Sequence, residues 1–225
     1  MTATPSDRRP IAARQLGVFQ SMASSLAWAG VSPNAISAAG MVAGLGAGVC
    51  LALTSSVVAD RAAWIAGAAL IQLRLLANMM DGMVAERAGK TSKIGELFNE
   101  IPDRVSDSAT LIGFGFAMGS SPMAGVVGAL LAALTAYVRA VGKGAGVPGA
   151  FCGPMAKQQR MALVTMTAVF FAVTPHEFRV WSWKVPGLDA NATVPVTVLW
   201  IICIGCVFTC SRRLHFIIGH LRSRV

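Results

Sequence analysis

The chain has 225 residues, of which 55% are hydrophobic and 13% are charged, and its mean hydropathy is +0.62. A soluble domain carries roughly 25% charged residues, so the composition excludes an ordinary soluble enzyme and indicates a membrane protein. The net charge of +9 fits an anionic membrane surface and anionic substrates, and we expect no nucleic acid partner.

The first 30 residues precede the first long apolar stretch. They hold Arg8, Arg9 and Arg14 among scattered apolar residues, without the continuous apolar core of a cleavable signal peptide. We therefore predict that residues 1–30 form a cytoplasmic N-terminal segment. Two structures remain open for it, an amphipathic helix that lies on the membrane surface and a partly ordered tail.

Six apolar stretches follow, and each approaches the roughly 20 residues that a helix needs to cross a bilayer. We predict an all-α, polytopic membrane protein with six transmembrane helices in one domain, residues 31–225. Ser32 is expected to cap the first of these helices, with Pro33 in its first turn. The predicted spans are 34–54, 62–82, 98–119, 122–142, 158–174 and 194–211.

The basic residues are distributed unevenly about these spans. All but three of the 19 Lys and Arg residues lie in segments assigned to one side of the membrane, and the exceptions are Arg61, Arg179 and Lys184. The positive-inside rule places the basic side in the cytoplasm. We predict an integral protein of the bacterial inner membrane, with both termini and the active site in the cytoplasm.

Six of the ten acidic residues lie between positions 78 and 107, at the cytoplasmic ends of the second and third predicted spans. Carboxylates at a membrane are costly, so they indicate a functional site. Their spacing predicts two facing stripes on helices, and such oxygen ligands favour divalent cations with a phosphate-bearing substrate. The first stripe is Asn78, Asp81 and Ala85, and the second is Gly95, Asn99, Asp103 and Asp107.

A Gly- and Pro-rich loop joins the fourth and fifth predicted spans on the same side. Lys143 and Lys157 lie in it, and Arg139 and Arg160 flank it. Gly-rich backbone beside cations can receive a phosphate. A flexible cytoplasmic loop with the charge that topology requires is an equally good interpretation.

The acidic segment resembles the motif of the CDP-alcohol phosphatidyltransferases. That family shares the pattern D-x-x-D-G-x-x-A-R, a short gap, and then G-x-x-x-D-x-x-x-D. This chain has N-x-x-D-G-x-x-A-E-R from Asn78 to Arg87, and G-x-x-x-N-x-x-x-D from Gly95 to Asp103. The six-span layout also resembles the family, so that the resemblance covers about 30–215.

The resemblance implies a phospholipid-synthesis transferase. Such enzymes move a phosphatidyl or related phospho-group from a CDP-linked donor, for which we expect CDP-diacylglycerol, to an alcohol and release CMP. It implies one or two Mg²⁺ or Mn²⁺ ions, Asp103 as the catalytic base, and a homodimer. The implied metal ligands are Asn78, Asp81, Asn99 and Asp103.

The resemblance also implies two binding surfaces. One would hold the CDP moiety against bare helix backbone, and the other would hold a phosphate of the acceptor or lipid. The CDP surface would comprise Gly82, Ala85, Arg87 and Gly95. The phosphate surface would comprise Arg139, Lys143, Lys157 and Arg160.

The chain departs from the family pattern at three positions. Asn78 and Asn99 stand where the family has Asp, and an Asn offers a carbonyl oxygen without charge. Glu86 replaces the family Arg, with Arg87 one position later. Two functions therefore remain open, an active transferase and a catalytically degenerate relative that binds nucleotide or lipid headgroups or scaffolds membrane enzymes. The acceptor alcohol is not indicated.

Overall fold

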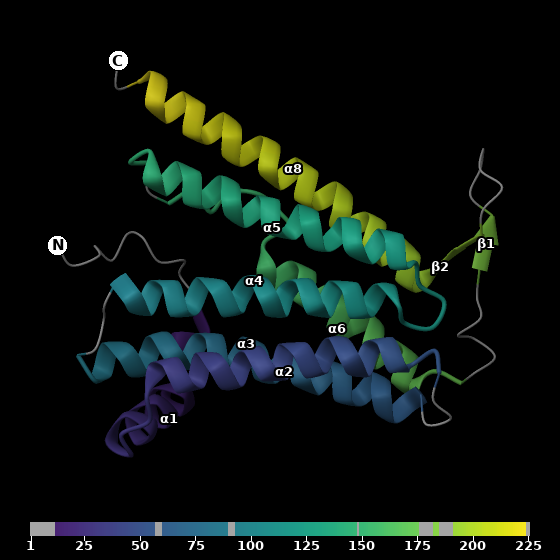
Figure 1. Cartoon of the computed structure of the whole chain (residues 1–225), viewed down its shortest axis with the longest axis horizontal. Coiled ribbons are helices and arrows are strands. Elements are labelled where there is room, and N and C mark those ends of the chain that lie inside the picture. The colour runs from purple at the N-terminus through teal and green to yellow at the C-terminus, as the bar shows by residue number, and fades with distance from the viewer. Residues whose placement is uncertain are drawn as a thin grey trace.

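The computed structural model is a bundle of helices that run back and forth along one direction (Figure 1). It describes residues 12–56, 60–89, 93–147, 149–175, 182–184 and 191–223, without the side chains of 12, 13, 93–98 and 191. A 3-10 turn (Ala12–Gln15) leads into α1 (Gly17–Trp28), which lies at an angle to the other helices. The long helices are α2 (Pro33–Leu53), α3 (Asp60–Arg87), α4 (Lys93–Gly115), α5 (Pro122–Gly144), α6 (Lys157–Val173) and α8 (Val194–Arg222).

Four helices in the described part of the chain are long and apolar enough to cross a membrane, namely α2, α3, α5 and α8. They identify an integral membrane protein, as predicted. The six predicted spans overlap α2 to α6 and α8, but six crossings are not confirmed. Helix α6 has only 17 residues, and α4 carries Glu100, Asp103, Arg104 and Asp107 in its sequence.

The side chains are arranged as a lipid-facing protein requires. Large apolar residues point outward along the long helices, for example Val42 (65% exposed), Leu130 (69%) and Ile204 (68%). Small residues such as Ala47 and Ala132 are buried between the helices. Because lipid is as apolar as these outer side chains, close packing of small residues supplies the contact between membrane helices.

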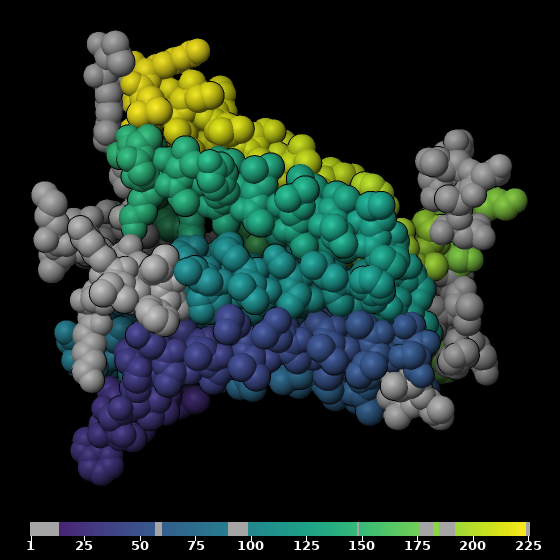
Figure 2. All heavy atoms as spheres, in the orientation of Figure 1, coloured from purple at the N-terminus to yellow at the C-terminus, as the bar shows by residue number. Residues whose placement is uncertain are grey.

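Helix α2 lies between α3 and α4 and contacts both closely. Its glycines allow the approach to α4: a Cβ at Gly44 would overlap Ser106, and a Cβ at Gly48 would overlap the carbonyl of Ala109. Figure 2 shows α2, α4 and α5 as one continuous face, with α8 beyond α5. The two helices that carry the motif, α3 and α4, are therefore both packed closely against α2.

The helix starts follow the sequence signals. The hydroxyl of Ser32 accepts a hydrogen bond from the backbone N–H of Ala35 (3.4 Å), and Pro33 occupies the first turn of α2, as predicted. Ser121 and Thr193 cap α5 and α8 in the same way. The described chain also contains two short strands before α8. These strands, β1 (Ser182–Lys184) and β2 (Asn191–Thr193), form an antiparallel pair.

Replacing Gly48 with Ala should lower the stability of the bundle by about 1–3 kcal/mol, the usual cost of overpacking. The added methyl group would overlap the backbone of α4. Gly46→Ala is the matched control, because its Cβ meets only the flexible Leu70 side chain at 3.3 Å. Thermal unfolding in detergent measures both variants, and equal midpoints would contradict the close α2–α4 contact.

Candidate functional site

The predicted site runs from the last turns of α3 and the first turns of α4 inward to the middle of both helices, where α6 begins. Asp81 on α3 is 3% exposed. Its Oδ2 accepts a hydrogen bond from the hydroxyl of Ser37 on α2 (2.6 Å), and its Oδ1 accepts one from the backbone N–H of Gly82 (2.6 Å). The first motif carboxylate is thus buried and fixed in direction by two donors.

Asp103 on α4 is bound by cations from two other helices. Its Oδ1 accepts hydrogen bonds from the guanidinium of Arg74 on α3 and from Nζ of Lys157 on α6 (2.6 Å). Arg74 also donates from Nε to the hydroxyl of Ser106, at 2.9 Å. The second motif carboxylate therefore joins α3, α4 and α6.

Asp107 extends the same network one turn further along α4. Its Oδ2 accepts a hydrogen bond from Arg160 (3.1 Å), and its Oδ1 lies 3.5 Å from Nζ of Lys157. Arg160 also donates to the carbonyl of Met155, at 2.9 Å. Removing one partner of a buried ion pair leaves an uncompensated charge and costs about 3–5 kcal/mol, so α4 and α6 depend on both members of each pair being present.

Room for the Arg74 side chain is provided by a glycine on the facing helix. A Cβ at Gly40 would lie 2.7 Å from Nη1 of Arg74 and 2.7 Å from the Cβ of Ala77. Any other residue at position 40 would therefore push Arg74 away from its position beside Asp103. The sequence prediction missed Arg74 and Ser37, although Arg74 lies on the same helical stripe as Asn78, one turn earlier.

The two motif positions at which Asn replaces Asp both hold a buried amide oxygen without a partner among the described residues. The two atoms are Oδ1 of Asn78 and Oδ1 of Asn99. A buried oxygen without a partner costs about 1–3 kcal/mol, so a bound group is expected there. Amide oxygens are suitable ligands for Mg²⁺ and Mn²⁺.

The Arg74–Asp103 pair relates the two stripes to one another. Helices α3 and α4 are consecutive and antiparallel, and Arg74 contacts Asp103. One helical turn toward the site end leads from Arg74 to Asn78 and from Asp103 to Asn99. Both Asn residues therefore lie about one turn from the Arg74–Asp103 pair, on the same side of it, with Asp81 next along α3. Within the described chain no three His, Cys, Asp or Glu residues form a metal-binding group.

A family model for CDP-alcohol phosphatidyltransferases matches residues 30–210. The chain belongs to this family. The match confirms the resemblance drawn from the motif at residues 78–103 and, with it, the prediction of an enzyme of this transferase class.

Several characterised family members are similar to the chain in sequence. It is 28% identical over 190 residues to a phosphatidylinositol phosphate synthase of Streptomyces avermitilis, covering 82% of this chain and 71% of the relative. It is 25% identical over 158 residues to a phosphatidylinositol phosphate synthase of Mycobacterium tuberculosis, covering 67% of this chain and 65% of the relative. The match therefore spans slightly less than two thirds of the mycobacterial relative.

The fold also matches solved structures. The phosphatidylinositol phosphate synthase of Mycobacterium tuberculosis with CDP-DAG bound superposes with a TM-score of 0.69, at 21% identity, over 90% of this chain and 94% of that one. The same enzyme in complex with manganese and citrate superposes with a TM-score of 0.67, at 21% identity, over 88% of each chain. At this identity the likeness establishes the fold.

The residues predicted to contact CDP lie along the end of α3 and the start of α4. Gly82 is open on its surface, where the nearest side-chain atom to an added Cβ is Nη2 of Arg14, at 3.7 Å. Ala85 is partly buried on the same helix. Gly95 lies in the first turn of α4, where side-chain surroundings fall outside the described part.

Arg87, which was expected to contact the CDP moiety, binds helix α1 instead. Its guanidinium donates to the backbone carbonyl of Gln20 and to Oε1 of Gln20 (2.6 Å). Helix α1 also packs its Ala23 into an apolar cluster with Met80 and Val84 of α3. Arg87 therefore fastens α1 to the site end of α3, a contact that the sequence prediction did not foresee.

Most of the predicted phosphate-binding cations already have acidic partners. Arg139 binds Glu100 and lies over the ring of Phe151, at 5.6 Å. Lys157 and Arg160 bind Asp103 and Asp107 as described above. Lys143 lies in the last turn of α5. The structure thus brings Lys157 and Arg160 into the acidic site and places Arg139 at its edge.

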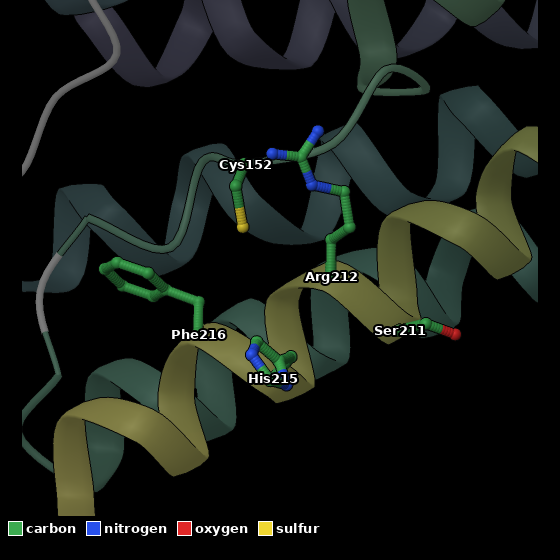
Figure 3. A pocket seen from close by; sticks show the side chains of 5 residues that line it. All are labelled: Cys152, Ser211, Arg212, His215 and Phe216. Atoms are coloured by element: carbon green, nitrogen blue, oxygen red, sulfur yellow. The ribbon is translucent and has the colours of Figure 1, made fainter.

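A separate groove lies on the outer side of α8, with a volume of about 490 Å³. Figure 3 shows Arg212, His215 and Phe216 projecting from α8 near Cys152 of the α5–α6 connection. None of the motif residues lines it. The groove is therefore distinct from the candidate site.

Arg87→Ala should loosen α1, because both hydrogen bonds to Gln20 would be lost while the apolar contacts remain. Hydrogen exchange of the backbone amides in Gly17–Trp28 should become several-fold faster. Arg222→Ala, an exposed arginine at the end of α8, is the control and should leave that exchange unchanged. Unchanged exchange in Arg87→Ala would contradict the docking role.

Proposed function

We propose that this chain transfers a phosphatidyl or related phospho-group from a CDP-linked lipid, CDP-diacylglycerol, to an alcohol and releases CMP, in a reaction that depends on Mg²⁺ or Mn²⁺. The observation that carries the proposal is the pair of buried carboxylates, Asp81 and Asp103, at the motif positions of a family member. The mycobacterial enzyme of the same fold, solved with CDP-DAG and with manganese, supports the donor and the metal.

The proposed chemistry uses few protein groups. The acceptor hydroxyl oxygen attacks the lipid-side phosphorus of the donor, the bond from that phosphorus to the bridging oxygen breaks, and CMP leaves with the electron pair. Asp103 takes the hydroxyl proton, held in place by Arg74 and Lys157. Asn78, Asp81 and Asn99 would hold a divalent cation, which when bound neutralises charge on the pyrophosphate.

The donor and the acceptor are proposed to bind against different helices. The CDP moiety would lie against the helix backbone at Gly82, Ala85 and Gly95, because these three residues have no large side chain to cover it. The acceptor would lie on the side of α5 and α6, whose cations are Arg139, Lys143, Lys157 and Arg160. The names of the relatives support an acceptor that carries a phosphate.

The arrangement in the membrane is also a proposal. We propose that α2 to α6 and α8 all cross the bacterial inner membrane, with the site end in the cytoplasm, and that the chain forms a homodimer. Residues 1–30 would form a cytoplasmic N-terminal segment that precedes the membrane domain, 31–225. Helix α1 would lie on the membrane surface, which the 92% exposure of Trp28 supports.

Asp81→Ala and Asp103→Ala should each reduce CMP release at least about 100-fold, since the first removes a cation ligand and the second a proton acceptor. The measurement is CMP production by purified protein from CDP-diacylglycerol with Mg²⁺ or Mn²⁺ and a panel of alcohols. Asp60→Ala, at the opposite end of α3, is the matched control and should retain activity. Activity that survives in Asp81→Ala would contradict the assigned site.

One observation favours a second function. Asn78 and Asn99 remove two charges from the family motif, which is the change expected of a relative that binds nucleotide or lipid headgroups, or scaffolds membrane enzymes, without turnover. Wild-type protein that binds CDP-diacylglycerol but releases no CMP with any acceptor, at saturating metal, would establish this second function in place of the first.

A further inference from the structure

We propose that the site binds a single divalent cation, and that the guanidinium of Arg74 and the ammonium of Lys157 take the place of a second one. The identity of the substrate rests on the proposed function. The number of ions rests on side chains of this chain alone.

The first argument is what surrounds Asp103. Its Oδ1 is bound by both Arg74 and Lys157, and these side chains are only 4% and 10% exposed. A carboxylate oxygen that already accepts two charge-assisted hydrogen bonds is poorly available to a metal ion. Gly40 leaves the space that the Arg74 guanidinium fills, at 2.7 Å from its would-be Cβ, so the backbone of α2 is fitted to this arrangement.

The second argument is what lies one turn away. Asn78 and Asn99 each lie one turn from the Arg74–Asp103 pair, on the same side of it, and the Oδ1 of each is buried without a hydrogen-bond partner in the described structure. Asp81 follows along α3 and makes no ion pair with a described residue. Two neutral oxygens and one carboxylate form a donor set for one hard cation, completed by substrate and water.

The third argument is the balance of charge. Asp81, Asp103 and Asp107 carry three negative charges, and Arg74, Lys157 and Arg160 carry three positive charges. One divalent ion is then matched by the two negative charges of the pyrophosphate in a CDP-linked lipid. With the donor alone bound, a second divalent ion would leave two positive charges without compensation. Asp at positions 78 and 99 would add the two negative charges that a second ion needs.

Electron paramagnetic resonance with Mn²⁺ tests the proposal directly on detergent-solubilised protein in the presence of CDP. Two ions in one site lie about 3.5–4 Å apart and give a spin-coupled spectrum, whereas a single ion gives an uncoupled one. We expect one uncoupled Mn²⁺ per chain, which Asp81→Asn abolishes. A coupled pair in the wild type, or no bound Mn²⁺ with CDP present, would overturn the proposal.

Two further variants test the role of Arg74. The double variant Asn78→Asp with Asn99→Asp keeps Arg74, and we expect it to bind one Mn²⁺ at least about tenfold more tightly, because ligand charge raises affinity. Adding Arg74→Met should open the second position and produce the coupled spectrum. A coupled pair in the double variant would show that Arg74 does not exclude a second ion.

The one-ion proposal and the proposed transferase activity can each be contradicted while the other stands. A single bound Mn²⁺ without CMP release would contradict the proposed function and leave the one-ion inference standing. CMP release accompanied by a coupled Mn²⁺ pair would do the reverse.

Discussion

Arg74 reaches from α3 to Asp103 on α4 inside a bundle whose outer surface is apolar. Both side chains are largely buried, Arg74 at 4% and Asp103 at 12% exposure, so each depends on the other to compensate its charge. The pair ties α3 to α4, and Lys157 of α6 binds the same carboxylate.

The packing of small residues makes this ion pair geometrically possible. Gly40 admits the guanidinium, while Gly44 and Gly48 bring α2 against α4. Because α2 contacts both motif helices closely, it sets their separation, and its Ser37 orients Asp81 directly. The helix without motif residues thus determines much of the site. Arg74 and Asp103 lie in the middle turns of α3 and α4, where pairing offsets the cost of burying their charges.

Much of the site was predictable from spacing. Asp81 and Asp103 were expected on polar stripes of two neighbouring helices, because residues three and four apart share a helical face. The structure places them on α3 and α4 and shows that both are buried. Glu100 is exposed and binds the half-buried side chains of Arg104 and Arg139. Six crossings were not established, because α4 carries charge and α6 is short. Ser37 and Gln20 were not foreseen, since each lies far along the chain from its partner and has no distinguishing neighbours.

The sequence by itself determined the membrane class, the family and the two stripes of polar residues, because composition and helical periodicity are local properties of the chain. It also showed that two motif charges had been lost at Asn78 and Asn99. Only the tertiary structure decided what compensates the remaining charges. Lys157 and Arg160 were expected to receive a phosphate, yet they bind Asp103 and Asp107. Which cation pairs with which carboxylate depends on how α2, α3, α4 and α6 pack together. The residue spacing within one helix cannot specify its packing against helices that are distant in the sequence.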